Sequence, residues 1–170
     1  MQAREVFAWA LQRGLYVDQM RVAVQTLTAK DWLTAIEGKA GATKTTTIGA
    51  LREVIEQQGI TVRGFGPTTG SVRALEEAGI HARTVASLLA SQAPRAQSEL
   101  SHRSVWIVDE SSLLSTRQVY GLLQRARDER VGRVIFVGDQ RQHGAVEAGK
   151  PVAQMQQAGM RTARLDVIRR

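Results

Sequence analysis

The stretch EGKAGATKTTT, residues 37–47, differs from a phosphate-binding loop at one position. Such a loop has the pattern Gly, four residues, Gly-Lys and then Ser or Thr. Gly38, Lys44 and Thr45 stand at the required places, but Thr43 replaces the second glycine. In this pattern the lysine reaches the β- and γ-phosphates of a nucleotide, and the final hydroxyl binds Mg²⁺. The alternative is a glycine-rich turn between a strand and a helix that holds no ligand.

The loop also offers backbone N–H groups to a phosphate. Glycines let these groups approach phosphate oxygens, and the N-terminus of the following helix adds positive potential. A β-branched residue in place of the second glycine costs about 1–3 kcal/mol if that position needs a positive φ angle. The full cost would weaken nucleotide binding by roughly tenfold to a hundredfold. The predicted nucleotide-binding residues of the loop are Gly38, Gly41, Ala42, Thr43, Lys44, Thr45 and Thr46.

Two acids follow the apolar run VWIV, in the stretch VWIVDESS at residues 105–112. One carboxylate at such a place can hold Mg²⁺ through its waters, and the second can act as a base toward the attacking water. Asp109 and Glu110 would take these two roles. The alternative is a pair of solvated acids that cap the next helix. The Lys-Thr loop earlier in the same predicted sheet favours the nucleotide-binding interpretation.

A third polar cluster, VIFVGDQRQHGAVEAG at 134–149, places Gln142 where it could hydrogen-bond a γ-phosphate and report its loss. The alternative is a polar loop that only turns the chain. A decayed site should have lost some of its costly polar groups, whereas only the glycine is missing. We therefore expect a working or weakened ATP site. Its catalytic residues are Lys44, Asp109, Glu110 and Gln142, and its Mg²⁺ ligands are Thr45 and Asp109.

Apolar strands that alternate with helices are expected to position these motifs. Strands are predicted at 32–37, 60–66, 104–110, 133–139 and 161–166, and helices at 5–12, 20–26, 45–58, 71–78, 83–90, 116–127 and 152–158. Strands that are apolar throughout and alternate with helices indicate a parallel sheet covered on both faces. Ligands bind at the carboxyl ends of such strands, where all three motifs lie. The predicted fold class is α/β, doubly wound, with a mainly parallel sheet.

The composition is that of one soluble domain. The 170 residues are 43% hydrophobic and 23% charged, and no run approaches the ~20 apolar residues of a membrane span. We expect a single domain over 1–170, with a helical segment at about 1–30 and an exposed, mobile loop at about 91–103. The absence of cysteine excludes disulfides and thiolate metal sites. The opening residues are unlike a secretory signal, so a cytoplasmic location is expected.

The formal net charge is +7, which favours an anionic partner such as nucleic acid. The basic residues are mostly arginines, and they are scattered along the chain rather than clustered. A coding bias toward arginine would produce the same scatter, so charge alone leaves the partner open.

Taken together, these motifs resemble the first RecA-like motor domain of a superfamily 1 DNA helicase, which is a P-loop NTPase of the RecD-like branch. The similarity runs from about Gln19 to the C-terminus, and the helicase part of conjugative relaxases of the TraI type is the nearest family. The resemblance implies that Gln19 reads the adenine edge. It also implies that segment 64–89, with matching residues Pro67, Thr68 and Thr84, grips single-stranded DNA. Asp109 and Glu110 match the Walker B acids.

The C-terminal part resembles two further helicase motifs. Gln142 matches the glutamine of motif III, and Arg169 matches the arginine of motif IV. Three positions depart from the family: Thr43 replaces a glycine, His143 a leucine and Arg170 a glutamine. The chain ends within motif IV, so the second motor domain is expected in the remainder of a longer relaxase-helicase chain. No paired-tyrosine or three-histidine relaxase site is visible in the sequence.

The resemblance implies an ATP-dependent motor domain that couples hydrolysis to movement on single-stranded DNA in the full-length protein. The rival interpretation is a weakened or vestigial helicase domain that only binds single-stranded DNA. It is motivated by Thr43, the missing second domain and the charge. Residues expected to add electrostatic attraction for DNA are Arg63, Arg73 and Arg83. Each of these arginines could instead be a solvated residue at a helix or loop end.

Overall fold

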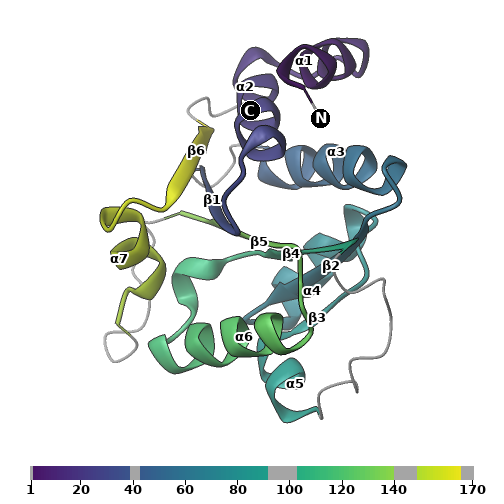
Figure 1. The fold of residues 1–170 in the computed structure, drawn as a ribbon. Helices are drawn as coiled ribbons and strands as arrows, with labels where there is room; N and C mark the ends of the chain where they lie inside the picture. Colours follow the sequence, from purple (N-terminus) through teal and green to yellow (C-terminus); the bar gives the residue numbers. More distant parts are fainter. Residues whose placement is uncertain (1, 39–42, 92–102, 140–148, 166–170) are drawn as a thin grey trace.

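The computed structural model describes residues 2–38, 43–91, 103–139 and 149–165 (Figure 1). Most of the loop predicted to be mobile, 91–103, lies outside the described residues. The same holds for four predicted site residues: Gly41, Ala42, Gln142 and Arg169.

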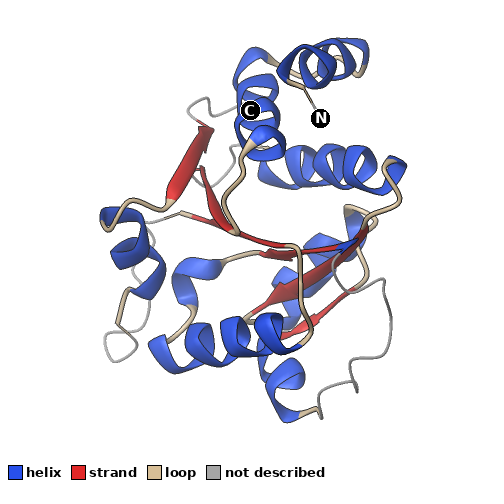
Figure 2. Cartoon of the chain, in the orientation of Figure 1, coloured by secondary structure: helices blue, strands red, loops and turns tan. Residues whose placement is uncertain are grey.

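A parallel sheet forms the centre of the molecule (Figure 2). Its strand order is β3-β2-β4-β5-β1-β6, and every pair of neighbours is parallel. This confirms the predicted fold class. Because all strands run the same way, their carboxyl ends meet at one edge of the sheet. The strands are β1 Leu33–Gly38, β2 Thr61–Gly66, β3 Ala82–Thr84, β4 Ser104–Val108, β5 Arg133–Gly138 and β6 Arg161–Leu165.

Helices cover both faces of the sheet. Buried residues of α2, α3 and α4 pack on one face, and those of α5, α6 and α7 pack on the other. No helix in the described part of the chain is both long enough and apolar enough to cross a membrane. The helices are α1 Ala3–Gln12, α2 Val17–Thr28, α3 Lys44–Gln57, α4 Thr69–Glu77, α5 Val85–Ala90, α6 Thr116–Asp128 and α7 Pro151–Gln157, and a short 3₁₀ turn, η2, covers Ser111–Leu113.

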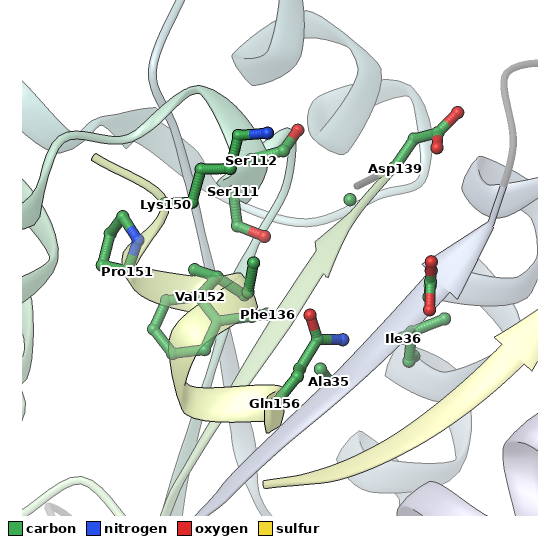
Figure 3. Close-up of a pocket in the computed structure, with 13 residues that line it drawn as sticks. Ala35, Ile36, Ser111, Ser112, Phe136, Asp139, Lys150, Pro151, Val152 and Gln156 are labelled. Carbon is green, nitrogen blue, oxygen red and sulfur yellow. The ribbon is translucent and has the colours of Figure 1, made fainter. Parts of the chain in front are cut away.

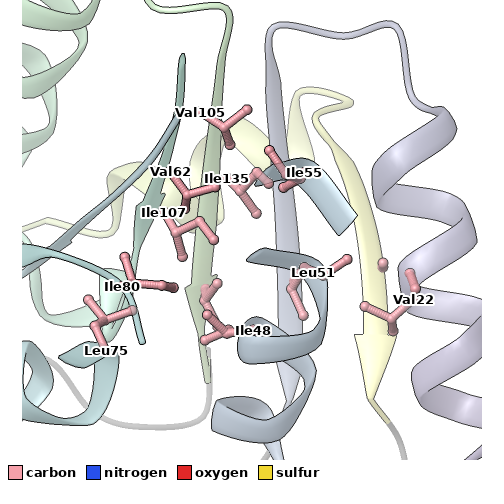
Figure 4. Packing of buried hydrophobic residues seen from close by; sticks show 14 of the residues in the cluster. Val22, Ile48, Leu51, Ile55, Val62, Leu75, Ile80, Val105, Ile107 and Ile135 are labelled. Atoms are coloured by element: carbon pink, nitrogen blue, oxygen red, sulfur yellow. The ribbon is translucent and has the colours of Figure 1, made fainter. Parts of the chain in front are cut away.

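The central strands are mostly apolar because they contribute to two cores. In β4, Val105 and Ile107 pack under α2 and α3, whereas Trp106 and Val108 face α5 and α6. Side chains alternate across a strand, so a strand buried on both faces is mostly apolar, with the buried Thr34 of β1 as an exception. Figure 4 shows the first core, in which α3 and α2 cover the same face of the sheet and α2 packs on β6 and β1.

The predicted helix at 83–90 is wrong at its start. Residues Ala82–Thr84 form strand β3, which pairs in parallel with β2, and the helix begins only at Val85. A strand of three residues has too few alternations to be recognised in the sequence. Its existence depends on the neighbouring strand, which is distant in sequence. The predicted strand 104–110 also ends earlier, at Val108, so both acids lie in the turn that follows.

The two-sided core predicts a large loss of stability for Ile107→Ala. Ile107 is 0% exposed in the central strand β4, and an Ile→Ala change at such a site costs about 2–5 kcal/mol of unfolding free energy. Urea unfolding followed by circular dichroism measures it. The control is Leu11→Ala, because Leu11 is 61% exposed and its loss should stay within about 0.5 kcal/mol. Equal unfolding midpoints for the two variants would contradict this packing.

Candidate functional site

The phosphate-loop candidate joins β1 to α3. Lys44 opens α3, and its Nζ donates a hydrogen bond to the carbonyl oxygen of Gly38 at 2.8 Å. A Cβ atom added to Gly38 would lie 3.1 Å from the Cβ of Leu165 and 3.3 Å from the Cγ of Lys44. The glycine at this position therefore lets the lysine stem pass close to the end of β1.

Thr43 has a left-handed backbone, with φ 54° and ψ 31°. The condition under which threonine is costly at this position, a positive φ angle, is therefore met. The conformation costs a β-branched residue about 1–3 kcal/mol, and such strained residues cluster at functional sites. The described non-glycine residues with positive φ are Thr43, Glu110 and Arg130. The first two belong to the candidate site, whereas Arg130 follows the end of α6.

Asp109 follows β4 and is 7% exposed. Its backbone N–H donates to the carbonyl of Phe65, and its carboxylate accepts the backbone N–H of Glu110 at 2.8 Å. Burial raises the pKa of Asp109, and the negative charge of Glu110 raises it further. The hydrogen bond from Glu110 and the positive charge of Lys44 lower it. Lys44 follows β1 and Asp109 follows β4, and the carboxyl ends of these two strands lie at the same edge of the sheet.

Glu110 connects the acids to the start of α4. Its Oε2 accepts a hydrogen bond from the Thr68 hydroxyl at 3.4 Å, and the same hydroxyl accepts the backbone N–H of Ser71 as the N-cap of α4. Thr68 was predicted to contact DNA and Glu110 to activate water. The structure therefore places the two predicted sites in contact through a single hydrogen bond.

The predicted DNA-contacting residues form two groups: the residues at strand ends, Pro67, Thr68 and Thr84, and the three arginines. Thr84 pairs with Gly66 and caps α5 by accepting the backbone N–H of Ser87. Because Pro67 and Thr68 directly follow Gly66, they lie with Thr84 at the carboxyl ends of two adjacent strands. This is the arrangement that a shared DNA-contacting edge requires.

The three predicted arginines do not form one surface. Arg83 lies 5.9 Å from the ring centroid of Phe65 and donates to the hydroxyl of Ser91, on the face covered by α5 and α6. Arg63 pairs with Glu129, the residue that follows α6, at 3.8 Å on that same face. Arg73 lies on α4, which covers the opposite face. Burial lowers the pKa of Arg83, and the nearby arginines lower it further.

Thr45 and Thr46 lie exposed on the first turn of α3. Together with Arg13, Leu15 and neighbouring residues they line an open groove of about 400 Å³. Among the described residues no cluster of three or more His, Cys, Asp or Glu side chains could hold a metal ion. Mg²⁺ does not require one, because it commonly takes one or two carboxylates together with substrate phosphates and water. The exposed Thr45 hydroxyl and Asp109 fit that mode of binding.

Gln19 lies beneath the loop and is 2% exposed. Its Nε2 donates to the hydroxyls of Thr43 and Thr47, each at 3.2 Å, and its Oε1 accepts the backbone N–H of Tyr16 at 3.0 Å. Sequence reasoning missed Thr47. Its position three residues after Lys44 on a buried helix face was the only signal that could have indicated it.

A second hollow lies between the carboxyl ends of β1 and β5, η2 and α7 (Figure 3). Its volume is about 30 Å³, enough for little more than a water molecule and far too small for a nucleotide. Its polar lining includes Ser111, Ser112 and Lys150, but neither Lys44 nor Asp109 lines it. Among the described residues, the arrangement that can serve a triphosphate is therefore the end of β1, the start of α3 and the acids after β4.

The raised pKa of Asp109 predicts how Asp109→Asn changes stability with pH. The folded domain holds this proton more tightly than the unfolded chain, so wild-type stability falls as pH rises between the ordinary value of 3.8 and the raised value. Asn removes that penalty. The variant should unfold at higher urea than wild type at about pH 7.5, and this gain should shrink toward about pH 4. Urea midpoints at the two pH values measure it.

The control for this prediction is Glu76→Gln, since Glu76 is an exposed acid on α4. It should change the midpoint little at either pH. A loss of stability for Asp109→Asn at neutral pH would show that the carboxylate charge stabilises the fold.

Comparisons with known proteins agree with this geometry. A family model described as an AAA domain matches residues 14–170. The conjugal transfer protein TraA of Rhizobium radiobacter is 33% identical over 134 residues, which are 78% of this chain and 12% of that protein. The multifunctional conjugation protein TraI of Escherichia coli strain K12 is 29% identical over 151 residues, covering 83% of this chain and 8% of TraI. The chain thus spans only a small part of these relatives.

The crystal structure of the Pif1 helicase from Candida albicans has the same fold. It superimposes with a TM-score of 0.67 at 18% identity, covering 91% of this chain and 40% of that one. The family match covers most of the chain. The chain therefore belongs to the AAA domain family, has a RecA-like fold and is similar in sequence to TraA and TraI.

Proposed function

We propose that this domain binds ATP with Mg²⁺ and, within a longer conjugative-transfer relaxase-helicase, couples ATP hydrolysis to movement along single-stranded DNA. The observation that carries the proposal is the common edge of the sheet at which both groups lie: Lys44 is bonded to the carbonyl of Gly38 at the end of β1, and the buried Asp109 follows the end of β4. Lys44 lowers the pKa of Asp109, although the two residues come from different loops. A cation and a buried carboxylate held together at a helix N-terminus are the groups that a magnesium-bound triphosphate requires.

Each side chain has a role in this proposal. Lys44 leaves the carbonyl of Gly38 and neutralises phosphate charge. Thr45 and Asp109 hold Mg²⁺, which supplies charge neutralisation at the phosphates when it is bound. Glu110 accepts a proton from the attacking water. Because Thr68 donates to Glu110, a DNA strand that engages Thr68 would release the carboxylate. Gln142 remains a candidate for a contact with the γ-phosphate, and Arg169 a candidate for nucleotide binding.

A DNA-binding module that has lost its motor is the second candidate function. The strained Thr43 backbone favours it, because any loss of nucleotide affinity would leave the DNA surface intact. The two functions differ in what Lys44 does. In the motor, Lys44→Ala abolishes ATP turnover of the full-length protein. In the module, the same change leaves DNA affinity and function unaltered.

Calorimetric titration of ATP–Mg²⁺ tests the nucleotide site directly. Lys44→Ala removes the charge that meets the phosphates, so its affinity should fall by at least about a hundredfold, since a charged hydrogen bond is worth roughly 1.5–3 kcal/mol and the Coulomb attraction adds to it. Lys30→Ala removes an exposed lysine after the end of α2 and should bind like wild type. Folding of each variant is checked by its melting curve. Absence of binding to the folded wild-type domain at millimolar nucleotide would refute the proposal.

Single-stranded DNA should bind without sequence preference, across the edge that carries Pro67, Thr68 and Thr84. Phosphate contacts position a strand without reading its bases, and counterion release makes the affinity fall with salt. We expect Arg63→Glu with Arg83→Glu to weaken binding of labelled oligo-dT and to reduce the salt slope by about two. Fluorescence anisotropy at several salt concentrations measures both quantities.

Because Arg73 lies on the other face of the sheet, Arg73→Glu is measured separately. It shows which face of the sheet the DNA follows. Arg4→Glu on α1 is the control for a change in net charge alone, and it should have the smallest effect. Equal affinities for all these variants would place the DNA surface elsewhere.

A further inference from the structure

Gln19 has a buried amide whose polar atoms are all engaged within the protein. Both N–H groups of Nε2 are used, one by the Thr43 hydroxyl and one by the Thr47 hydroxyl, each at 3.2 Å. The carbonyl Oε1 accepts the backbone N–H of Tyr16. A backbone N–H can only donate, so this bond determines which end of the amide is oxygen. The nitrogen must then face the two threonines.

The bonds close a ring around the backbone of Thr43. The Thr47 hydroxyl accepts from Gln19 and donates to the Thr43 carbonyl at 3.0 Å, and the backbone N–H of Thr47 donates to the same carbonyl. Gln19 meanwhile holds the Thr43 hydroxyl. The side chain and the carbonyl of Thr43 are therefore both held, and this is the residue whose left-handed backbone is strained.

A glycine at this position would adopt the left-handed conformation without support, whereas threonine needs surroundings that impose it. Glycine would also offer no hydroxyl to Gln19. The residue that departs from the loop pattern is thus the residue that supplies the acceptor for Gln19. Thr43 and the buried Gln19 are therefore linked by a hydrogen bond that a glycine at position 43 could not make.

We propose that Gln19 is a positioning residue that holds Thr43 in the left-handed conformation of the phosphate loop and does not select the base of the nucleotide. The inference rests on the proposed nucleotide site. With its amide satisfied by Tyr16, Thr43 and Thr47, Gln19 contributes nothing to the distinction between adenine and guanine. Loss of Gln19 therefore acts on the triphosphate, which every nucleoside triphosphate carries.

Affinity for ATP–Mg²⁺ and for GTP–Mg²⁺ is measured by calorimetry in four single variants and one double variant of the 170-residue chain. Gln19→Met keeps most of the buried volume and removes the amide. Thr43→Val keeps the β-branched shape and removes the hydroxyl, whereas Thr43→Ser keeps the hydroxyl. Thr43→Gly restores the glycine of the pattern, alone and together with Gln19→Met.

We expect Gln19→Met and Thr43→Val each to weaken both nucleotides by the same factor, about tenfold. Thr43→Ser should bind like wild type. Thr43→Gly should bind at least as well as wild type, and adding Gln19→Met to it should change nucleotide affinity little. A loss confined to ATP would show that Gln19 reads adenine and would overturn the proposal. An equal loss from Gln19→Met with or without Thr43→Gly would also overturn it.

Urea unfolding in the absence of nucleotide tests the pair independently of the proposed function. Coupling predicts that Gln19→Met lowers the unfolding midpoint less in the Thr43→Gly background than in wild type. Equal shifts in both backgrounds would refute the coupling. If no variant binds nucleotide, the proposed function fails, and this cycle still decides whether Gln19 supports Thr43. If Gln19→Met does not fold, Thr43→Val against Thr43→Ser makes the same comparison.

Discussion

The parallel pairing of β1, β5 and β4 is the constraint on which the candidate site depends. β5 lies between the other two strands, with Ala35 opposite Phe136 and Ile107 opposite Ile135. This register brings the end of β1, which leads into the loop, to the same edge as the end of β4, which leads into the acids. Each central strand buries both of its faces, so a shift by one residue would exchange the side chains that fill the two cores and leave both badly packed. The packing of two apolar cores therefore determines where Lys44 and Asp109 meet.

Several features of the candidate site lower the stability of the folded state. Thr43 and Glu110 have left-handed backbones, and Asp109 is a buried carboxylate whose pKa is raised mainly by the loss of water. Strained backbones and desolvated charges persist only where the surrounding structure imposes them. Here the surroundings are the ring from Gln19, the N–H of Glu110 and the charge of Lys44. The packing of the two cores thus offsets the free-energy cost of the strained and buried groups at the site.

Not all of the positive charge of the protein is available to bind an anion. Arg133 donates to the backbone carbonyls of Thr26 and Ala29, and burial lowers its pKa. Arg125 is 10% exposed, pairs with Glu129 and donates to the carbonyl of Ser91. These guanidinium groups satisfy carbonyls at the ends of helices, where orphan acceptors need donors. Part of the arginine content is therefore structural, and the electrostatic contribution to DNA binding comes from fewer residues than the composition suggests.

The amino-acid sequence by itself determined the fold class, the strands that carry the motifs and the residues Lys44, Asp109 and Glu110, because apolar periodicity and motif spacing are local properties. The glycine of the pattern raised the question of a positive φ at Thr43, and the structure answered it. Only the tertiary structure decided the short strand β3, the opposite faces of Arg73 and Arg83, and the ring between Gln19 and the loop. These features depend on partners far apart in sequence, such as Gln19 and Thr43. A hydrogen bond between distant segments leaves no periodicity, so the sequence could suggest a role for Gln19 but not its neighbours.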